Sequence, residues 1–491
     1  MLMKMAVLRR SIVAFLFCLL LAPAAGARDI YVRLSQAGSF TVASDGNMTL
    51  SGKGKTVTLG KSASLSVKGG NVTVGKTSLA LPVHITSTGL LRFNGRQYRG
   101  AFMVTQKAGL MNVLNIEQYL CGVLPAEVGA DWPAETLRAQ AIISRTYALR
   151  QSLDRAKKGY DVVDTVSDQV YKGAGVETAK TNHAVSSTAD MVLAYGKELA
   201  FTPFHSDSGG HTANNAHVWG ASVPYLTGVA EPIAYTSPVS TWSAKISRGA
   251  VEKAVAKTAG GGNIAPISEV RVSEVDKGGR AVSLTFVGAK GTRTVKASQF
   301  RLAVGAKLLK STMLTPSASA ASRKAAAAQS PQGRMPQMPV ASKPASRPAP
   351  ARENSGSLTL AETKQLSEMA SRGVFTTLEI IDMLSNPEKK RSYYNLGLKR
   401  TGRAPGAAPE KKASPSKPVS PGNPKPPVPE PALKRGFTVA RSGDNFLFYG
   451  RGWGHGVGLS QWGARSLAQN GWTAERILTY YYPGTTVRRY Q

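Results

Sequence analysis

Apolar and polar residues alternate in short runs through the first part of the chain. The runs at residues 30–34, 56–59 and 65–67 place apolar residues at every second position, and glycines and Lys-Gly pairs separate them. Successive side chains of a strand point to opposite faces, so a period of two predicts strands with one buried face. We therefore expect a β-rich region over residues 28–113.

The pattern becomes helical at about residue 130. Pro133 suits the first turn of a helix, Glu135 complements its positive end, and residues up to about 153 are rich in alanine and leucine. Near the end of the chain, the Asn-Gly pair at 470–471 predicts a helix stop, and residues 473–482 predict a last helix. Strands followed by a few helices predict an α+β fold.

Residues 1–27 have the pattern of a secretory signal peptide. Two arginines precede an apolar run at residues 11–21, and small residues follow up to Ala27. Cleavage there would remove Cys18 and leave Cys121 as the single cysteine, so the mature chain could form no internal disulfide. We interpret Cys121 as a small buried hydrophobe. The expected location is outside the cytoplasm, in the periplasm or the cell wall.

Residues 311–435 differ in composition from the rest. They hold 18 of the chain's 28 prolines, among alanine, serine, lysine and arginine, and few large apolar residues. Such a composition buries too little surface to fold, which predicts a disordered insert. Residues 357–383 are richer in leucine and isoleucine and predict a short helical island. Because sequence typical of folded protein lies on both sides, we expect one core, formed by residues 114–310 and 436–491, that the insert interrupts.

The net charge is +33, from 62 basic and 29 acidic residues, and the insert carries about +12 of it. A basic, exported chain would adsorb to anionic polymers of the wall or to membrane head groups, and the insert would contribute much of this attraction. We do not expect nucleic acid as a partner, because the chain carries an export signal and none of the common nucleic-acid-binding motifs.

Four ordered segments resemble the SpoIID/LytB family (stage II sporulation protein D). They are the stretch from Leu114 to Leu149, with "YLCGVLPAEVGADWPAETLRAQAIISRTYAL", followed by "SDQVYKG" at 167–173, "HSDSGGHT" at 205–212 and "GRGWGHGVGLSQWGA" at 450–464. The resemblance covers about 29–310 and 437–491. It implies a SpoIID-type core in an exported peptidoglycan-active protein that cleaves MurNAc-GlcNAc strands, preferably denuded of stem peptides, to 1,6-anhydro products. The alternative is a LytB-like glycan-binding modifier of a wall amidase that cuts nothing.

Glu127 matches the family's catalytic carboxylate. A lytic transglycosylase needs one carboxyl group that donates a proton to the glycosidic oxygen and then takes one from the C6 hydroxyl, so a second carboxylate is unnecessary. Leu124, Val128 and Trp132 are near in sequence and would raise its pKa by desolvation. Its spacing alone would make it a cap or a solvated charge in a loop before the helix. We interpret two other carboxylates, Glu117 and Glu135, as structural.

Three of the six histidines, His205, His211 and His217, lie six residues apart. Imidazole is a common zinc ligand, so a zinc site is one interpretation; no other cofactor is expected. Six-residue spacing does not place them on one helix face, and the other interpretation is three separate hydrogen-bonding roles. Both stay open. A zinc site would favour a third function, a metal-dependent wall hydrolase.

The remaining candidates are expected to bind substrate. They come from the matching motifs and comprise Arg145, Tyr147, His205, Ser208, Trp453, His455 and Gln461. Glycines at every second position of 450–458 permit close approach of a ligand to the backbone, and indole faces suit sugar rings. The other interpretation of these glycines is tight packing of the loop.

Overall fold

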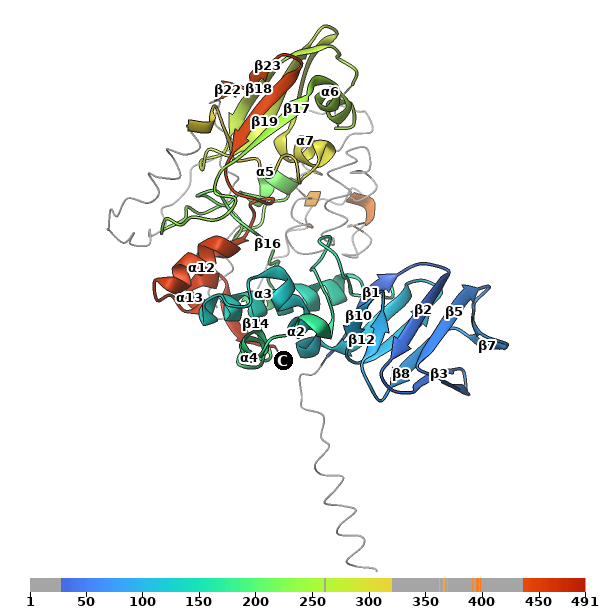
Figure 1. The fold of residues 1–491 in the computed structure, drawn as a ribbon. Coiled ribbons are helices and arrows are strands. Elements are labelled where there is room, and N and C mark those ends of the chain that lie inside the picture. The colour runs from blue at the N-terminus through green and yellow to red at the C-terminus, as the bar shows by residue number, and fades with distance from the viewer. Residues whose placement is uncertain are drawn as a thin grey trace, which may run out of the picture. The chain divides into compact units, whose positions relative to one another are not determined.

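The computed structural model describes residues 28–259, 262–319 and 436–490, with scattered residues between 362 and 398. The expected signal peptide and helical island, and most of the expected insert, lie outside this part or are described only in scattered positions. The fold is α+β, as predicted (Figure 1). The chain divides into two compact units: unit 1 holds residues up to Asp131, Gln140–Val192 and Arg488 onward, and unit 2 holds Trp132–Ala139 and Leu193–Val487.

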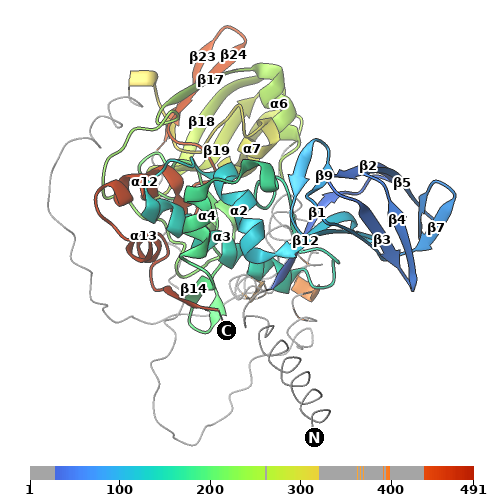
Figure 2. The ribbon, with the colours of Figure 1, turned by 60° about the horizontal axis from the view of Figure 1, so that its bottom comes forward.

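Unit 1 contains the predicted β-rich region, which forms two mainly antiparallel sheets (Figure 2). The seven-stranded sheet has the order β13 (Val162–Val163), β1 (Asp29–Ser35), β12 (Gly109–Asn115), β11 (Ala101–Thr105), β8 (Val83–Ser87), β3 (Met48–Gly52), β4 (Lys55–Leu59). The six-stranded sheet has the order β10 (Arg96–Tyr98), β9 (Leu91–Phe93), β2 (Ser39–Ser44), β5 (Ser62–Lys68), β6 (Asn71–Val74), β7 (Thr77–Ala80).

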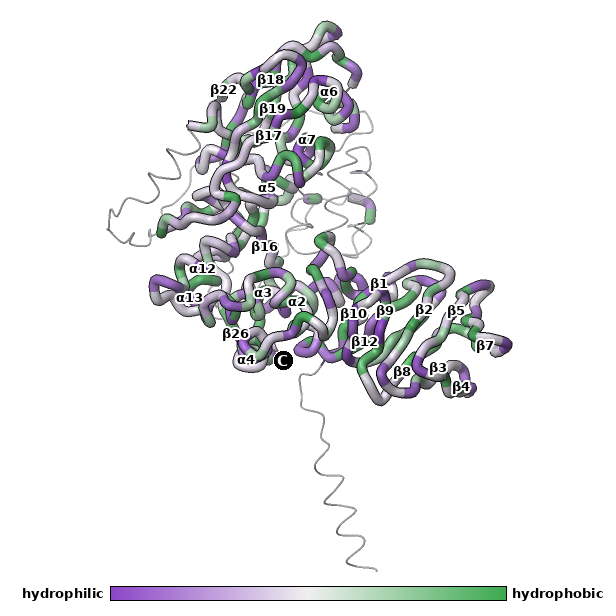
Figure 3. Tube along the Cα trace, viewed as in Figure 1, coloured by the Kyte–Doolittle hydropathy of each residue, from purple (hydrophilic) through white to green (hydrophobic). Residues whose placement is uncertain are grey.

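Alternation along these strands places every second side chain in a core. In β5, Ala63 and Leu65 are buried whereas the residues on either side are exposed, and Val83 and Ile85 repeat the pattern in β8. Figure 3 shows green and purple positions interleaved along these strands. The period of two therefore predicted both the strands and their buried faces.

Helices complete unit 1. They are α2 (Ile116–Glu127), the larger part of α3 (Ala134–Asp154), the 3₁₀ helix η1 (Ala174–Val176) and α4 (Ala179–Ser186). The Asn115 side chain begins α2 by accepting a hydrogen bond from the Glu117 backbone N–H. Helix α3 confirms the predicted helix. It is buried around most of its circumference, so it is a central element of the packing.

Unit 2 contains two four-stranded sheets and several helices. One sheet joins β17 (Trp242–Ser247), β24 (Asn445–Gly450), β21 (Leu314–Thr315) and β23 (Ala440–Ser442); the other has the order β20 (Gly291–Lys296), β19 (Ala281–Gly288), β18 (Ile267–Val275), β22 (Phe437–Thr438). The helices are α5 (Asn215–Trp219), α6 (Arg248–Ala256), α7 (Ala297–Val304), α12 (Gln461–Gln469) and α13 (Ala474–Tyr481), and α12 and α13 agree with the predicted stop and last helix. Strands β14 (Met191–Tyr195), β15 (Glu198–Leu199) and β26 (Thr486–Arg489) form a further sheet.

Strands from before and after the long insert pair with one another in unit 2. Strand β24 pairs with both β17 and β21, and β22 pairs with β18. The folded part reaches further than expected: the insert was predicted to begin at residue 311, yet Ser311 and Met313 are buried and β21 follows. The strand was not predicted, because it is only two residues long and the boundary was set by the change to Pro-, Ala- and Ser-rich composition just beyond it. Among the described residues, no helix is long and apolar enough to span a bilayer.

Gly122 of α2 packs closely against the segment at 171–173. A Cβ atom there would lie 2.6 Å from Tyr171 Cε2 and 2.8 Å from the Gly173 carbonyl oxygen. We predict that Gly122→Ala lowers the free energy of unfolding by about 1–3 kcal/mol through overpacking. The matched control is Gly249→Ala in α6, where nothing lies within 4 Å of the added carbon; it should be neutral or slightly stabilising. Urea unfolding of both variants tests this, and equal effects would contradict it.

Candidate functional site

Glu127 is the last residue of α2, not a loop residue as its spacing suggested. Pro125 lies within the last turn of this helix, and the Val128 N–H closes it on the Leu124 carbonyl. A proline so near a helix end disturbs little, because it removes only one backbone hydrogen bond there. The helix therefore fixes the backbone that carries the candidate catalytic carboxylate.

The Glu127 carboxylate is half-buried and has one protein hydrogen bond among the described residues. Its Oε1 accepts from the Val170 N–H at 2.6 Å. Burial raises the pKa of Glu127 to about 7, and the Val170 N–H opposes this rise by stabilising the anion. Near neutral pH both protonation states are populated, which is the condition for a group that first donates and then accepts a proton.

A buried ion pair positions the segment that holds Glu127. Asp168 accepts two hydrogen bonds from Arg155, at 2.6 and 2.8 Å, and both side chains are 0% exposed. The same carboxylate also accepts from the Val163 N–H at 2.8 Å and from the Tyr147 hydroxyl at 2.7 Å. Four donors thus fix Asp168, two residues before Val170.

Hydrogen bonds also hold the side chains of the two residues on either side of Val170. The Tyr119 hydroxyl donates to Gln169 Oε1 at 3.1 Å, and the Tyr171 hydroxyl donates to Asn112 Oδ1 at 2.7 Å. Gln169, Tyr119 and Tyr171 are all buried. The Val170 N–H therefore has a defined direction. The "SDQVYKG" motif was recognised in the sequence, but the role of Asp168 and Gln169 as supports of Glu127 was not, because it depends on contacts distant in sequence.

Arg145 lies in the interior of unit 1. It is 1% exposed, and it forms two hydrogen bonds to Glu117, at 2.7 and 2.6 Å, and further ones to the carbonyls of Met191 and Val185. In this arrangement it supports α2 rather than facing a ligand. The structural role expected for Glu117 agrees with this pair. The substrate contacts predicted for Arg145 and for the buried Tyr147 stay predictions.

Unit 2 brings two of the predicted motifs together. Strand β16 (Phe204–His205) pairs in parallel with β25 (Leu459–Ser460), and Asp207 and Trp453 exchange backbone hydrogen bonds at 3.0 and 2.9 Å. Trp453 is 39% exposed, with the Lys310 ammonium 5.5 Å from its ring centre. An accessible indole beside this junction suits a sugar face.

The alternating glycines of this loop serve tight packing. Gly452, Gly454, Gly456 and Gly458 all have positive φ values. A Cβ atom at Gly452 would lie 2.5 Å from the Asp207 carbonyl oxygen, and the other three would meet neighbours just as closely. The neighbouring protein segment thus occupies the space that the glycines provide.

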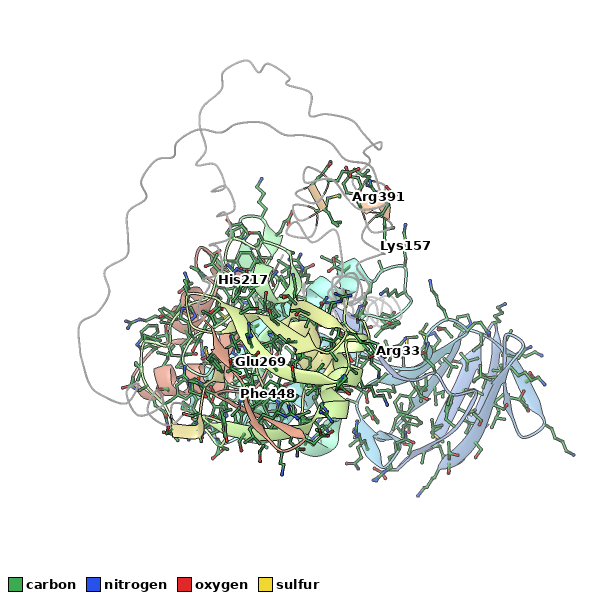
Figure 4. All side chains as sticks on the ribbon, turned by 90° about the horizontal axis from the view of Figure 1, so that it is seen from above. Arg33, Lys157, His217, Glu269, Arg391 and Phe448 are labelled. Carbon is green, nitrogen blue, oxygen red and sulfur yellow. The ribbon has the colours of Figure 1, made fainter. Side chains whose placement is uncertain are left out.

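The histidines occupy two separate places in unit 2. His205 is 4% exposed, its Nδ1 lies 3.2 Å from the Val457 carbonyl oxygen, and its ring centre is 5.5 Å from that of His455. Burial lowers the pKa of His205 well below its usual value and that of His455 to about 3, so both rings are neutral at physiological pH. His211 and His217 instead line a small cavity with Asp276 (His217 is labelled in Figure 4).

Within the described ranges, no three His, Cys, Asp or Glu side chains are arranged to hold a metal ion. The zinc interpretation of the three histidines therefore gains no geometric support and stays a prediction.

Ser208 belongs to a cluster that the sequence did not reveal. Its hydroxyl donates to Glu231 at 2.6 Å, and the Tyr481 hydroxyl donates to the other oxygen of Glu231 at 2.6 Å. Burial raises the pKa of Glu231 to about 7. A cavity of about 50 Å³ beside it is lined by Asp207, Glu231, Tyr235 and Arg451, among others. No sequence motif around Glu231 indicates a functional role. The residue is identified only by its hydrogen bonds to the hydroxyl groups of Ser208 and Tyr481, which are distant along the chain.

Two aromatic residues and an arginine form a further cluster of unit 2. The Trp132 and Trp462 ring centres are 5.0 Å apart, and the Arg465 guanidinium lies over both rings, at 5.6 and 4.9 Å. Gln461 precedes Trp462 and is 7% exposed at the start of α12. Glu135 caps a helix, because it accepts a hydrogen bond from the Ala474 N–H, which agrees with the structural role expected for it.

Comparison with known proteins finds a family model that matches part of the chain. Residues 104–195 match the model of the SpoIID family, described as Stage II sporulation protein. The matched segment includes α2 with Glu127, the "SDQVYKG" segment and the Arg155–Asp168 pair. The match to the SpoIID family over residues 104–195 confirms the resemblance drawn from the motifs.

Individual relatives extend this result. The chain is 36% identical over 138 residues to Stage II sporulation protein D of Bacillus subtilis, covering 25% of this chain and 40% of the relative. It is 25% identical over 397 residues to the Amidase enhancer of Bacillus subtilis, covering 76% of this chain and 40% of the relative. An uncharacterized protein of Brachyspira hyodysenteriae is 41% identical over 140 residues, covering 28% and 38%. The chain spans about two fifths of the length of these curated relatives.

Removing the Asp168 carboxylate, which fixes the segment that contains Val170, should destabilise unit 1. We predict that Asp168→Asn lowers the free energy of unfolding by about 3–5 kcal/mol, because it leaves the Arg155 charge buried without its partner. The control is Asp45→Asn, which breaks the exposed Arg92–Asp45 pair (2.8 Å) in the same unit and should cost less than about 1 kcal/mol. Denaturant unfolding compares them; similar losses would show that the buried pair has no special role.

The raised pKa of Glu127 also predicts a pH dependence of stability. Because its folded pKa, about 7, lies above its ordinary value of 4.5, the folded protein holds an extra proton between these values, so stability falls as pH rises from about 4.5 to about 7 and levels off above that. Glu127→Gln removes this loss, so at pH 8 the variant should be more stable than the wild type by up to about 3 kcal/mol, whereas near pH 4 the two should converge. Unfolding curves at both pH values measure this. A constant difference would contradict the raised pKa.

Proposed function

We propose that the chain is an exported lytic transglycosylase that cleaves peptidoglycan glycan strands, with Glu127 as its acid and base. One observation carries the proposal: the Glu127 carboxyl is desolvated to a pKa of about 7 while the Val170 N–H holds only one of its oxygens. Oε2 has no protein partner among the described residues. A proton on a carboxyl of this pKa is available near neutral pH.

The proposed reaction needs this single carboxyl group. Protonated Glu127 donates to the oxygen that links MurNAc C1 to the next sugar, and the C1–O bond breaks. The resulting carboxylate then takes the proton of the MurNAc C6 hydroxyl, whose oxygen bonds to C1 and closes the 1,6-anhydro ring. The enzyme ends protonated, as it began, and no water is consumed. Typical hydrolases need a second carboxylate for water or for a covalent intermediate.

A non-catalytic modifier of a wall amidase is the second candidate. The similarity to the Amidase enhancer favours it, since that alignment covers 76% of this chain. Under this second proposal the SpoIID-like region binds glycan, with Trp453 as one exposed contact, and Glu127 transfers no proton. Location in the wall or periplasm and adsorption to anionic polymers through the basic insert belong to both candidates.

Product analysis separates these functions. We predict that the purified protein converts denuded glycan strands to products with 1,6-anhydro ends in mass spectrometry, and that Glu127→Gln reduces this at least tenfold because an amide cannot donate and recover the proton. Glu198→Gln, the same change at an exposed position of β15, is the control and should retain activity. The wild-type kcat/KM should fall about tenfold per pH unit above a pKa near 7.

The other outcomes are equally defined. Binding without cleavage, together with stimulation of a wall amidase, would replace the enzyme by the modifier. Products with reducing ends that disappear with a chelator would indicate the metal-dependent hydrolase and a zinc site formed by histidines.

A further inference from the structure

The basic residues of the β-rich region fall into two groups. Between residues 29 and 113 there are ten lysines and arginines but only two acidic residues. The four arginines have partners: Arg92 pairs with Asp45, Arg96 with Asp164 and Arg99 with Glu177, and Arg33 lies over the Tyr160 ring. Lys107 donates to the Lys157 carbonyl. These five contacts are internal to unit 1.

The other five lysines are exposed and have no carboxylate partner among the described residues. They are Lys53, Lys55, Lys61, Lys68 and Lys76, and each lies in or beside a turn between strands β3 to β7. All five side chains are exposed, so packing in the core does not explain why lysine occupies these positions. Unpaired cations close together repel one another, and an anionic partner that binds them would offset this repulsion.

Strand register places three of these lysines at one end of the β region, here called the near end. Lys53 and Lys55 lie at the β3–β4 turn, where Gly52 pairs with Lys55. Lys68 closes the β5–β6 turn, where it pairs with Asn71. The link from β7 to β8 joins the two turns: the Leu81 N–H donates to the Gly70 carbonyl, and a Cβ atom on Gly52 would lie 3.0 Å from the Pro82 carbonyl oxygen.

Lys61 and Lys76 lie at the opposite ends of the same strands, here called the far end. Lys61 follows β4, whose last residue Leu59 pairs with Met48, and its carbonyl accepts from the Ser44 N–H. Lys76 lies in the β6–β7 turn, where Val74 pairs with Thr77. The two ends therefore carry lysines of the same kind on the same strands.

A cavity lies at the near end. It has a volume of about 390 Å³ and is lined by Ser51, Lys53, Lys55, Thr56 and the exposed His84, among others. Two ammonium groups with hydroxyl and imidazole donors suit an oxyanion. The exposed large hydrophobic residues of the described chain are Leu153, Val166, Leu302, Leu308 and Trp453, and none belongs to the β region, so this end offers nothing to insert into a lipid layer.

We infer that the near end binds a phosphodiester polymer, with its phosphates at Lys53, Lys55 and Lys68. This goes beyond the proposed cleavage of glycan and does not depend on it. Binding at the near end would hold the protein on an anionic polymer. The polymer would not occupy the candidate glycan site at Glu127. Lysine ammonium groups bind phosphates as point charges, so the contact should be salt-sensitive and should tolerate sliding along the polymer.

The test compares two variants with the same loss of charge in the full chain. Binding to poly(glycerol phosphate) is measured over a series of salt concentrations for Lys53→Gln/Lys55→Gln at the near end and for Lys61→Gln/Lys76→Gln at the far end. We expect the near-end variant to bind at least fivefold more weakly at about 0.1 M salt. Its slope of log affinity against log salt should be smaller by about 1.4, from about 0.7 for each lost contact with a flexible strand. The far-end variant should stay within twofold of the wild type.

Further arms decide the remaining outcomes. Lys53→Arg/Lys55→Arg keeps the charge and should restore binding, which excludes misfolding as the cause. Equal weakening by the near-end and far-end variants would overturn the inference, because only net charge would then matter. A near-end effect that appears with phosphatidylglycerol vesicles but not with the polymer would also overturn it in favour of a lipid surface. Glycan cleavage, assayed in parallel, should be unchanged in all variants.

Discussion

The buried ion pair between Arg155 and Asp168 is the contact on which the candidate active site depends. Its two side chains are fully buried and its carboxylate accepts four hydrogen bonds, so neither charge is left without compensation. Replacing such a pair by apolar residues is often harmless to stability, so its value is better sought in geometry. Here the pair fixes a segment whose backbone N–H, at Val170, reaches the Glu127 carboxylate.

The chemistry of Glu127 follows from a balance of two opposing effects. Removal from water favours the protonated form, and one backbone hydrogen bond favours the anion. A second donor would lower the pKa and keep the group ionised, whereas none would leave the acid without orientation. Helix α2 supplies the side chain, and a segment more than forty residues later supplies the single donor. Glu231 in unit 2 reaches a pKa of about 7 in another way, with hydroxyl groups rather than an amide around it.

Features that repeat locally could be predicted from the sequence, and those that depend on distant contacts could not. The period of two predicted the strands of the β region, and Ala-rich composition with a Pro-Glu start predicted α3. The family motifs indicated Glu127, but its position inside a helix was missed because a proline stands two residues before it. Asp168, Glu231 and the interior role of Arg145 were not foreseen, since most of their partners lie 13 to 250 residues away along the chain; only Val163, a donor to Asp168, is as near as five residues. Of the two interpretations of the glycines at 450–458, the structure supports tight packing, which depends on the neighbouring Asp207 segment, and the approach of a ligand to this loop stays a prediction.

A direct titration of Glu127 tests the central claim most closely. The protein is labelled with ¹³C at the glutamate side-chain carboxyls, and the Glu127 resonance is assigned by its loss in Glu127→Gln. Its chemical shift is then followed by NMR from pH 4 to pH 9. Desolvation at the end of α2 predicts a midpoint near pH 7. A midpoint below about pH 5, as in a solvated glutamate, would contradict the account of this site.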